Sequence, residues 1–193
     1  MRTDARHRLL ASISGLVHAR GYNAVGVEEI CRRAGVKKGS FYHFFRSKRA
    51  LMVAALEQCW QETEATLVAA ALAADVPPRR RVERLFDLAA AAEEDAKSRG
   101  GHVLGCPFGN LAAEISVTDE PMRRKIDDVF ARFAHAIERT LREAVAAGEL
   151  SDDTDPPSAA RALVAYFEGV RLLARTHNDP SLVRTLGRHA LSR

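Results

Sequence analysis

The 193-residue chain has only three cysteines, Cys31, Cys59 and Cys106, and they lie far apart. Their number is odd and their spacing fits no zinc-ligand pattern, which argues against both a disulfide framework and a zinc site. We therefore expect no bound metal and no other cofactor.

Long apolar runs are also missing. No stretch approaches the roughly 18 apolar residues that a membrane-spanning helix needs, and the first residues, Met1-Arg2-Thr3-Asp4, contain no apolar signal segment. Hydrophobic residues make up 47% of the chain and charged residues 28%, which is typical of a soluble globular protein. We expect a cytoplasmic protein that does not bind a membrane.

The usual signatures of enzymes are absent too. The sequence has no Gly-rich phosphate loop, no metal-ligand cluster and no Ser-centred nucleophile turn. Cys106 could act as a nucleophile if a base lay beside it, but of the seven histidines only His102 is close in sequence. The sequence predicts a protein that is not an enzyme, with a thiol-dependent enzyme as the alternative.

Basic residues are concentrated near the N-terminus. Residues 1–50 contain eleven Arg and Lys against three Asp and Glu, a net charge of +8, whereas the whole chain has +4. The other 143 residues must therefore carry −4. This asymmetry indicates a polyanionic partner bound by one end of the chain.

The stretch from Lys37 to Phe45 has the character of a second helix in a helix-turn-helix. It follows a turn at Gly35-Val36 that closes an amphipathic segment at 27–34. Its phenylalanines, at spacings i, i+3 and i+4, predict one buried stripe. The residues left facing outward are Lys37, Lys38, Gly39, Ser40, Tyr42 and His43. Lysines, hydroxyls and a phenol bind phosphates and base edges, and a glycine permits close backbone approach. An ordinary helix hairpin with a solvated basic face is the alternative.

Residues 9 to 52 resemble the DNA-binding domain of the TetR family of bacterial transcriptional regulators. The matching residues are Gly21-Tyr22, Val27-Glu28-Glu29-Ile30, Ala34-Gly35-Val36, Lys38 to Phe45, and Lys48. The resemblance implies a domain that binds double-stranded DNA, and it adds Lys48 to the DNA-binding residues. Gly26 departs from the family, which commonly has Ser or Thr at this helix N-cap, and the departure removes one hydroxyl that could meet a phosphate.

Apolar periodicity predicts an all-α fold of about nine helices. The predicted spans are 3–20, 27–34, 37–45, 47–74, a helix from Pro77-Pro78 to a loop at 97–101, a short helix within 105–114, 120–147, 156–176 and 181–191. We place a three-helix DNA-binding domain at 1–47 and a helical ligand-binding and dimerisation domain at 48–193.

Helix-turn-helix proteins usually bind DNA as two-fold dimers, because two recognition helices must lie about 34 Å apart to reach successive major grooves. The resemblance implies a homodimer on a palindromic operator, joined by a four-helix bundle of the C-terminal domain. We assign the interface to residues 156–176 together with either 120–147 or the terminal helix.

The segment Gly105-Cys106-Pro107-Phe108-Gly109-Asn110-Leu111 is the most unusual stretch outside the predicted DNA-binding domain. A cysteine at the first turn of a helix lies in the positive end of the backbone dipole, which lowers the thiol pKa. The segment is similar to one in a branch of the TetR family that includes sensors of electrophiles and oxidants. Two interpretations stay open: a reactive sensor, or a small apolar residue buried where a loop meets a helix.

A reversibly bound small molecule should instead occupy a pocket among the helices from 48 to 176. Candidate lining residues are Trp60, Phe108, Asn110, Tyr166, Phe167 and Arg171, each of which could equally belong to the core. An inducer that favours a state with more widely spaced DNA-binding heads would release the operator. The sequence therefore predicts a repressor released by an inducer or by modification of Cys106, with a DNA-bound dimer lacking any inducer as a further alternative.

Overall fold

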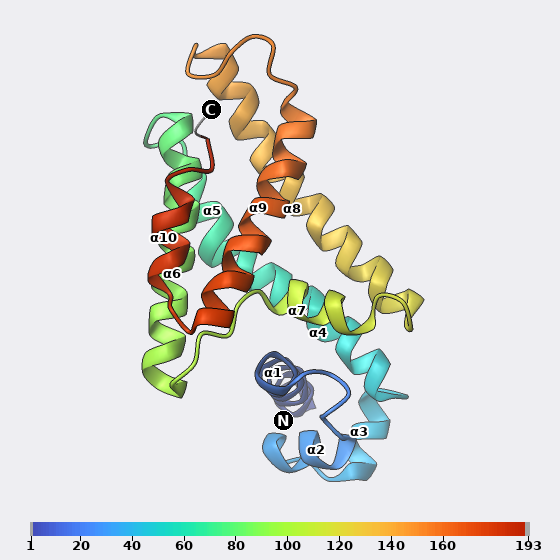
Figure 1. Ribbon diagram of the computed structural model, residues 1–193. Coiled ribbons are helices and arrows are strands. Elements are labelled where there is room, and N and C mark those ends of the chain that lie inside the picture. Colours follow the sequence, from blue (N-terminus) through green and yellow to red (C-terminus); the bar gives the residue numbers. More distant parts are fainter. Residues whose placement is uncertain (1, 192–193) are drawn as a thin grey trace. The chain divides into compact units, whose positions relative to one another are not determined.

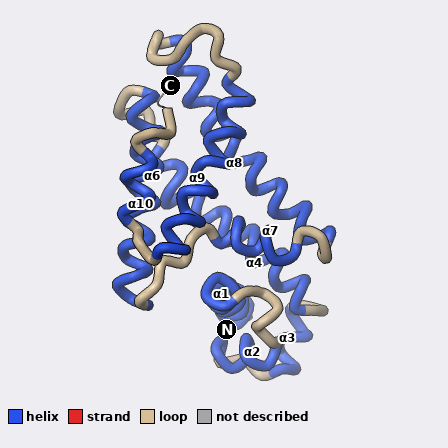
Figure 2. The backbone as a smooth tube through the Cα atoms, viewed as in Figure 1, coloured by secondary structure: helices blue, strands red, loops and turns tan. Residues whose placement is uncertain are grey.

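The computed structural model describes the backbone of residues 2–191 and the side chains of residues 5–191. Within this range the chain is all helix and loop, as predicted (Figures 1 and 2). The elements are α1 (Arg2–Arg20), α2 (Val27–Ala34), α3 (Lys38–Phe44), α4 (Lys48–Thr63), η1 (Glu64–Val68), α5 (Ala69–Ala71), α6 (Pro78–Gly100), α7 (Pro107–Ile115), α8 (Glu120–Ala146), α9 (Pro156–His177) and α10 (Ser181–Gly187). Because η1 is a π-helical turn that runs directly from α4 into α5, these elements make nine helices in the described chain.

The chain divides into two compact units. The first contains the residues up to Glu62 together with Pro107–Asp128, and the second contains Thr63–Cys106 together with the residues from Val129 onward. Helix α7 and the start of α8 therefore belong to the same unit as the predicted helix-turn-helix. No helix in the described part of the chain is long and apolar enough to cross a membrane.

The core of the first unit forms where the apolar periodicity predicts it. Leu9 and Ile13 of α1, Ile30 of α2 and Phe41 of α3 are all completely buried. Helix α2 ends at Gly35, which has φ +60° and donates its N–H to the Arg32 carbonyl, while the Val36 amide donates to the Cys31 carbonyl. Glycine reaches this left-handed conformation without a Cβ clash, so the turn that leads into α3 depends on it.

Helix α4 begins as predicted, with Ser47 Oγ accepting a hydrogen bond from the Ala50 amide at 3.0 Å. Further along this helix, Cys59 and Leu67 are half-buried, whereas Trp60 and Val68 are buried. The wider π turn at η1 interrupts the regular 3.6-residue period from Glu64 onward.

The second unit is held together by aromatic contacts and by close helix packing. Phe167 of α9 meets Phe86 of α6 and Phe133 of α8 edge-on, with centroid distances of 5.2 and 5.4 Å. Helices α6 and α10 lie side by side (Figures 1 and 2). A Cβ on Gly187 would lie only 2.4 Å from Phe86 Cβ, so α10 packs this closely because residue 187 is glycine.

Two predicted helix ends were wrong. The loop predicted at 97–101 is helical as far as Gly100, because Arg99 pairs with Asp95 one turn earlier and only Gly101, with φ +78°, leaves the helix. The last helix ends at Gly187 rather than near residue 191. The predicted end of α8 is confirmed, since the Gly148 and Glu149 amides donate to Val145 and Ala144 as in a Schellman motif.

Candidate functional site

Helix α3 presents a continuous polar surface. The residues predicted to face outward are exposed on it or just before it: Lys37, Lys38, Gly39, Ser40, Tyr42 and His43. Phe41 anchors the opposite side of the helix, and Tyr42, which is 52% exposed, packs edge-on against the Phe41 ring. Apart from Gly39's own neighbours and helix backbone, no described atom lies within 4 Å of a Cβ built on Gly39, so the backbone there is open to a partner.

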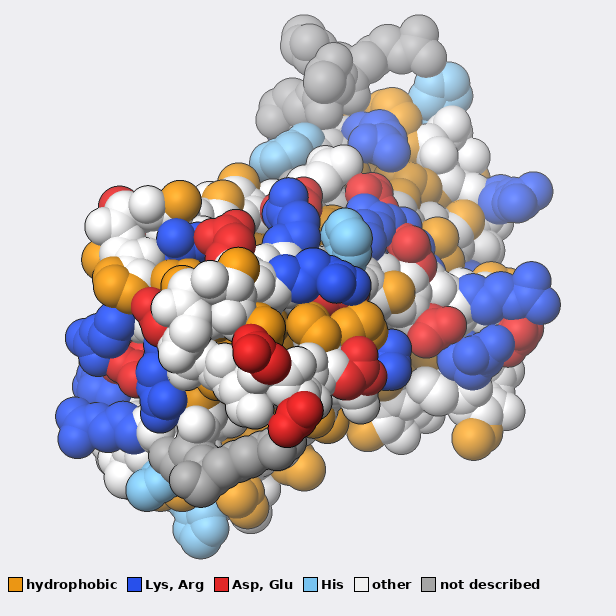
Figure 3. Space-filling model, turned by 90° about the horizontal axis from the view of Figure 1, so that it is seen from above, with side chains coloured by type: hydrophobic (Ala, Val, Ile, Leu, Met, Phe, Trp, Pro, Cys, Tyr) orange, Lys and Arg blue, Asp and Glu red, His pale blue; other side chains and the backbone are white. Residues whose placement is uncertain are grey.

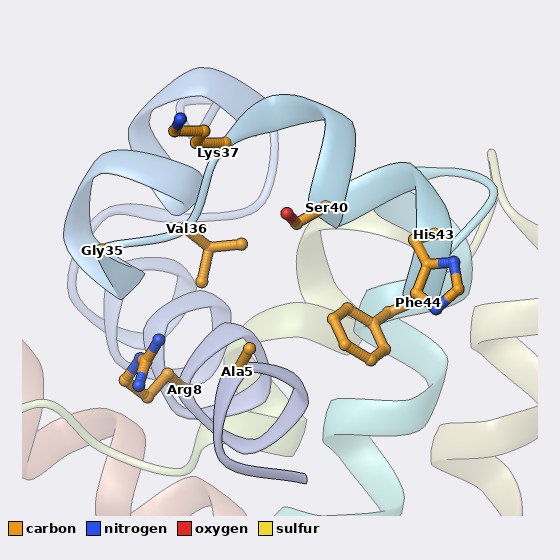
Figure 4. Close-up of a pocket in the computed structure, with 8 residues that line it drawn as sticks. All are labelled: Ala5, Arg8, Gly35, Val36, Lys37, Ser40, His43 and Phe44. Atoms are coloured by element: carbon orange, nitrogen blue, oxygen red, sulfur yellow. The ribbon is translucent and has the colours of Figure 1, made fainter. Parts of the chain in front are cut away.

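An open hollow of about 400 Å³ lies beside this surface, between α1 and α3 (Figure 4). Its lining residues are Ala5, Arg8, Gly35, Val36, Lys37, Ser40, His43 and Phe44. Arg8 of α1 was not among the predicted DNA-binding residues. Its Nε donates to the Ala34 carbonyl at 2.8 Å, which ties α1 to the end of α2.

The surface of α3 includes two lysines at its start, Lys37 and Lys38. Lys37 and Lys38 form no ion pair with any described residue, whereas Arg80 pairs with Glu83 and Arg142 with Glu138 on their own helices. One face of the molecule shows Lys and Arg side chains interspersed with Asp and Glu (Figure 3). Unpaired lysines beside exposed hydroxyls are suited to phosphate oxygens.

Lys48 is placed differently from the other predicted DNA-binding residues. Its side chain is half-buried, and its Nζ donates to the carbonyls of Tyr22 and Val25 at 3.0 and 2.9 Å. Nζ also lies 3.9 Å from the centroid of the Tyr22 ring, and burial lowers the pKa of Lys48. Two of its three N–H donors therefore hold the α1–α2 turn, which leaves one for a phosphate.

In the second unit, a buried ion pair holds the backbone just before Cys106. The guanidinium of Arg171 and the carboxylate of Glu93 lie 2.7 Å apart, with side chains 12% and 3% exposed. Glu93 Oε2 accepts the Leu104 and Gly105 amides at 3.1 Å each, and Arg171 Nη2 donates to the Gly105 carbonyl at 3.0 Å. The main chain that leads into Cys106 is thereby fixed by side chains of α6 and α9.

Cys106 is 6% exposed and lies directly before α7. Burial raises the pKa of Glu168, while the charge of Arg171 and a hydrogen bond with Cys106 oppose that rise. Burial by itself would lower the pKa of Arg171, but the negative charges of ionised Cys106, Glu93 and Glu168 raise it. The thiol thus lies near the carboxyl group of Glu168 and the guanidinium of Arg171. The guanidinium can stabilise a thiolate, and a carboxylate can accept the thiol proton.

Glu93 and Glu168 were not predicted as part of this site. A signal for Glu93 existed, because it lies four residues after Ala89 and seven after Phe86 on the buried stripe of α6, where a carboxylate requires a partner. His102, the base considered for an enzyme, is exposed.

The predicted ligand-lining residues fall into separate groups. Trp60 and Phe108 meet edge-on in the first unit, with centroids 6.4 Å apart, and Asn110 of α7 is half-buried. In the second unit Arg171 lies over the Phe167 ring at 5.4 Å, and Tyr166 donates its hydroxyl to the Leu186 carbonyl. Among the described residues, no group of three or more His, Cys, Asp and Glu side chains could hold a metal ion.

Two family models match most of the chain. Residues 9–55 match the description "Bacterial regulatory proteins, tetR family", and residues 78–190 match "Tetracyclin repressor-like, C-terminal domain".

Individual relatives are similar to this chain over nearly its whole length. The transcriptional regulator AcuR of Cereibacter sphaeroides is 37% identical over 186 residues, covering 93% of this chain and 83% of AcuR. The transcriptional repressor NemR of Escherichia coli is 30% identical over 176 residues, covering 89% of this chain and 84% of NemR. The crystal structure of a regulatory protein TetR from Rhodobacter sphaeroides superimposes with a TM-score of 0.83 at 33% identity, covering 96% of this chain and 98% of that one. The chain therefore belongs to the TetR family of bacterial transcriptional regulators.

Proposed function

We propose that the protein is a homodimeric repressor that binds a palindromic operator in the cytoplasm through α3 of each protomer. The observation that carries the proposal is the exposed surface at α3, where Lys37 and Lys38, which form no ion pair with a described residue, adjoin Ser40, Tyr42 and His43. The relatives DhaR of Mycobacterium sp. and NemR of E. coli are named repressors, which supports the direction of regulation. Residues 1–47 form the DNA-binding domain in this proposal, residues 48–193 form the regulatory domain, and no enzymatic step takes part.

The dimer contact proposed for 156–176 has a matching surface on α9. Leu172 and Leu173 are exposed by 59% and 47% although they are large and apolar. On the same helix Ala162, Ala165 and Gly169 are also exposed, at spacings of three and four residues. Small residues let a second helix approach closely, and covering the leucines supplies apolar burial. A second copy of α9 is therefore the proposed partner of this surface.

The proposed inducing event is modification of Cys106 by an electrophile or oxidant. Cys106 is buried directly before α7, where it hydrogen-bonds with Glu168 and interacts electrostatically with Arg171. A group added to the sulfur has no room there unless the segment moves. One solved relative is titled as the reduced form of E. coli NemR, with a TM-score of 0.84 and 27% identity. A reversible ligand among the helices from 48 to 176, near Trp60, Phe108, Asn110, Tyr166, Phe167 or Arg171, is the second candidate.

We expect N-ethylmaleimide to release the wild-type protein from its operator and to leave Cys106→Ser bound. The operator is the duplex that the protein selects from random DNA, and binding is followed by fluorescence anisotropy at fixed salt. An alkylated thiol cannot keep the buried position of Cys106, so affinity should fall at least tenfold, while serine forms no adduct.

Cys31→Ser and Cys59→Ser are the matched controls and should respond as wild type does. If Cys106→Ser also releases the DNA, Cys106 is not the sensor. If neither protein responds, a reversible ligand becomes the better explanation.

A further inference from the structure

The turn between α1 and α2 is held by a carboxylate from α7. Glu114 Oε2 accepts the Tyr22 amide and Oε1 accepts the Asn23 amide, both at 2.7 Å. Gly21, with φ +86°, directly precedes these amides, and a Cβ on Gly21 would lie 3.0 Å from Glu114 Oε2. Two charge-assisted hydrogen bonds therefore fix this turn from one side.

The same turn is held from its other side by α4. Lys48 Nζ donates to the Tyr22 and Val25 carbonyls. The Lys48 ammonium thus binds carbonyl groups of this short segment, while the Glu114 carboxylate binds its amide groups. Helix α2 begins at Val27, directly after this segment, and it leads through Gly35 into α3. Because no flexible linker intervenes, the position of the turn fixes the position of the helix-turn-helix within the first unit.

A further ion pair joins the end of the α7 segment to α4. Arg49 Nε and Asp119 Oδ2 lie 2.5 Å apart, and Asp119 Oδ1 also accepts the Met122 amide at the start of α8. A cavity of about 410 Å³ adjoins these contacts, lined by Tyr22, Asn23, Ser47, Lys48, Arg49, Ile115, Thr118, Asp119 and Met122. If the hydrogen bonds from Glu114 to the Tyr22 and Asn23 amides are lost, this cavity leaves space into which the turn can move.

Helix α7 is also the continuation of the Cys106 segment. Nine residues of helix, about 13 Å, run from Pro107 to Ile115. Before the helix, Glu93 and Arg171 fix Leu104 and Gly105; near its end, Glu114 holds Tyr22 and Asn23. A short rigid helix transmits an axial or rotational shift from one end to the other.

We propose that Glu114 is the positioning residue that couples the Cys106 segment to DNA binding. While the Cys106 thiol is unmodified, Glu114 holds the α1–α2 turn, and α3 stays in the position that binds the operator. When the segment around Cys106 rearranges, α7 withdraws the carboxylate and the turn loses its two hydrogen bonds. This inference rests on the proposed function, because it takes Cys106 as the point at which the signal enters.

The test compares Glu114→Gln with Glu120→Gln in a chain whose other cysteines are replaced by alanine at positions 31 and 59. Glu120 is the matched control, because it lies in the same unit and pairs with Arg123 and Arg124 of its own helix. Operator and random-sequence DNA affinities are measured by anisotropy. Hydrogen exchange at the Tyr22 and Asn23 amides is measured with and without N-ethylmaleimide.

We expect Glu114→Gln to bind the operator about tenfold more weakly than the parent chain, the size expected for losing a charge-assisted hydrogen bond. Random DNA should be bound nearly as before, and N-ethylmaleimide should add little further loss. In the parent chain, alkylation should speed exchange at both amides about tenfold. Glu120→Gln should behave as the parent chain in every measurement.

Other outcomes separate the two proposals. If alkylation releases the operator while exchange at Tyr22 and Asn23 is unchanged, or if Glu114→Gln responds in full, the coupling role is overturned and the sensor role of Cys106 stands. If alkylation has no effect on DNA binding, the sensor role of Cys106 fails. The operator and random-sequence affinities of Glu114→Gln then test the positioning role of Glu114 alone. In that case a selective loss of operator affinity supports its positioning role, whereas unchanged selectivity, even with lower thermal stability, overturns it.

Discussion

Replacing Arg171 by methionine is expected to destabilise the chain by about 3–5 kcal/mol, because it leaves the Glu93 carboxylate buried without its positive partner. Glu93 is 3% exposed, and the amides of Leu104 and Gly105 alone remain to solvate it. For a chain of this length, the midpoint of thermal unfolding should fall by about 6–20 °C. Circular dichroism of wild type and Arg171→Met measures the shift.

The double variant Arg171→Met with Glu93→Gln separates a broken ion pair from lost packing. Glutamine keeps an oxygen for the two amides and carries no charge, so the double variant should recover a large part of the stability lost in Arg171→Met. If the two substitutions add instead of compensating, the contact between Glu93 and Arg171 is not the reason for the loss.

Removing the two lysines at the start of α3 should have the largest effect on function. A dimer with Lys37→Ala and Lys38→Ala in both protomers loses up to four phosphate contacts. The slope of log affinity against log salt should then become shallower by about 3–4, and operator affinity near 0.1 M salt should fall on the order of 10²–10³-fold.

The matched control removes the same charge elsewhere, with Arg99→Ala and Arg139→Ala, two exposed residues outside the first unit. It should leave the salt slope within about one unit of wild type. Salt titrations by fluorescence anisotropy measure both variants. Equal losses in the two variants would mean that net charge, and not the surface of α3, governs binding.

The helix-turn-helix was predictable because its determinants are local. The apolar spacing of Phe41 and Phe45, the left-handed Gly35 and the Ser47 cap each depend on a few neighbouring residues. The end of α6 was mispredicted for the same local reason: Gly100 and Gly101 suggested a loop, whereas a single left-handed Gly101 was enough to stop the helix. The π turn at η1 left no mark on the apolar pattern that would separate it from regular helix.

The polar contacts of the candidate site were not predictable from spacing. Arg171 and Glu93 are 78 residues apart in the chain, and Glu114 is 92 residues from Tyr22. Helical periodicity relates residues a few positions apart and cannot indicate a contact between residues this distant in the sequence. A buried carboxylate on an apolar stripe, as at Glu93, was the one available sign, and it indicates that a partner must exist without identifying the partner.

Amine footprinting of the protein on its operator tests the central claim most directly. The chain has lysines only at 37, 38, 48, 97 and 125, so acetylation at each can be followed by mass spectrometry. Lys97 and Lys125 serve as internal references, because one donates to the Asn178 carbonyl and the other pairs with Glu57.

We predict that saturating operator DNA protects Lys37 and Lys38 from acetylation, leaves Lys97 and Lys125 unchanged, and loses its protective effect when N-ethylmaleimide is added. If Lys37 and Lys38 are acetylated equally with and without bound DNA, α3 is not the surface that binds the operator.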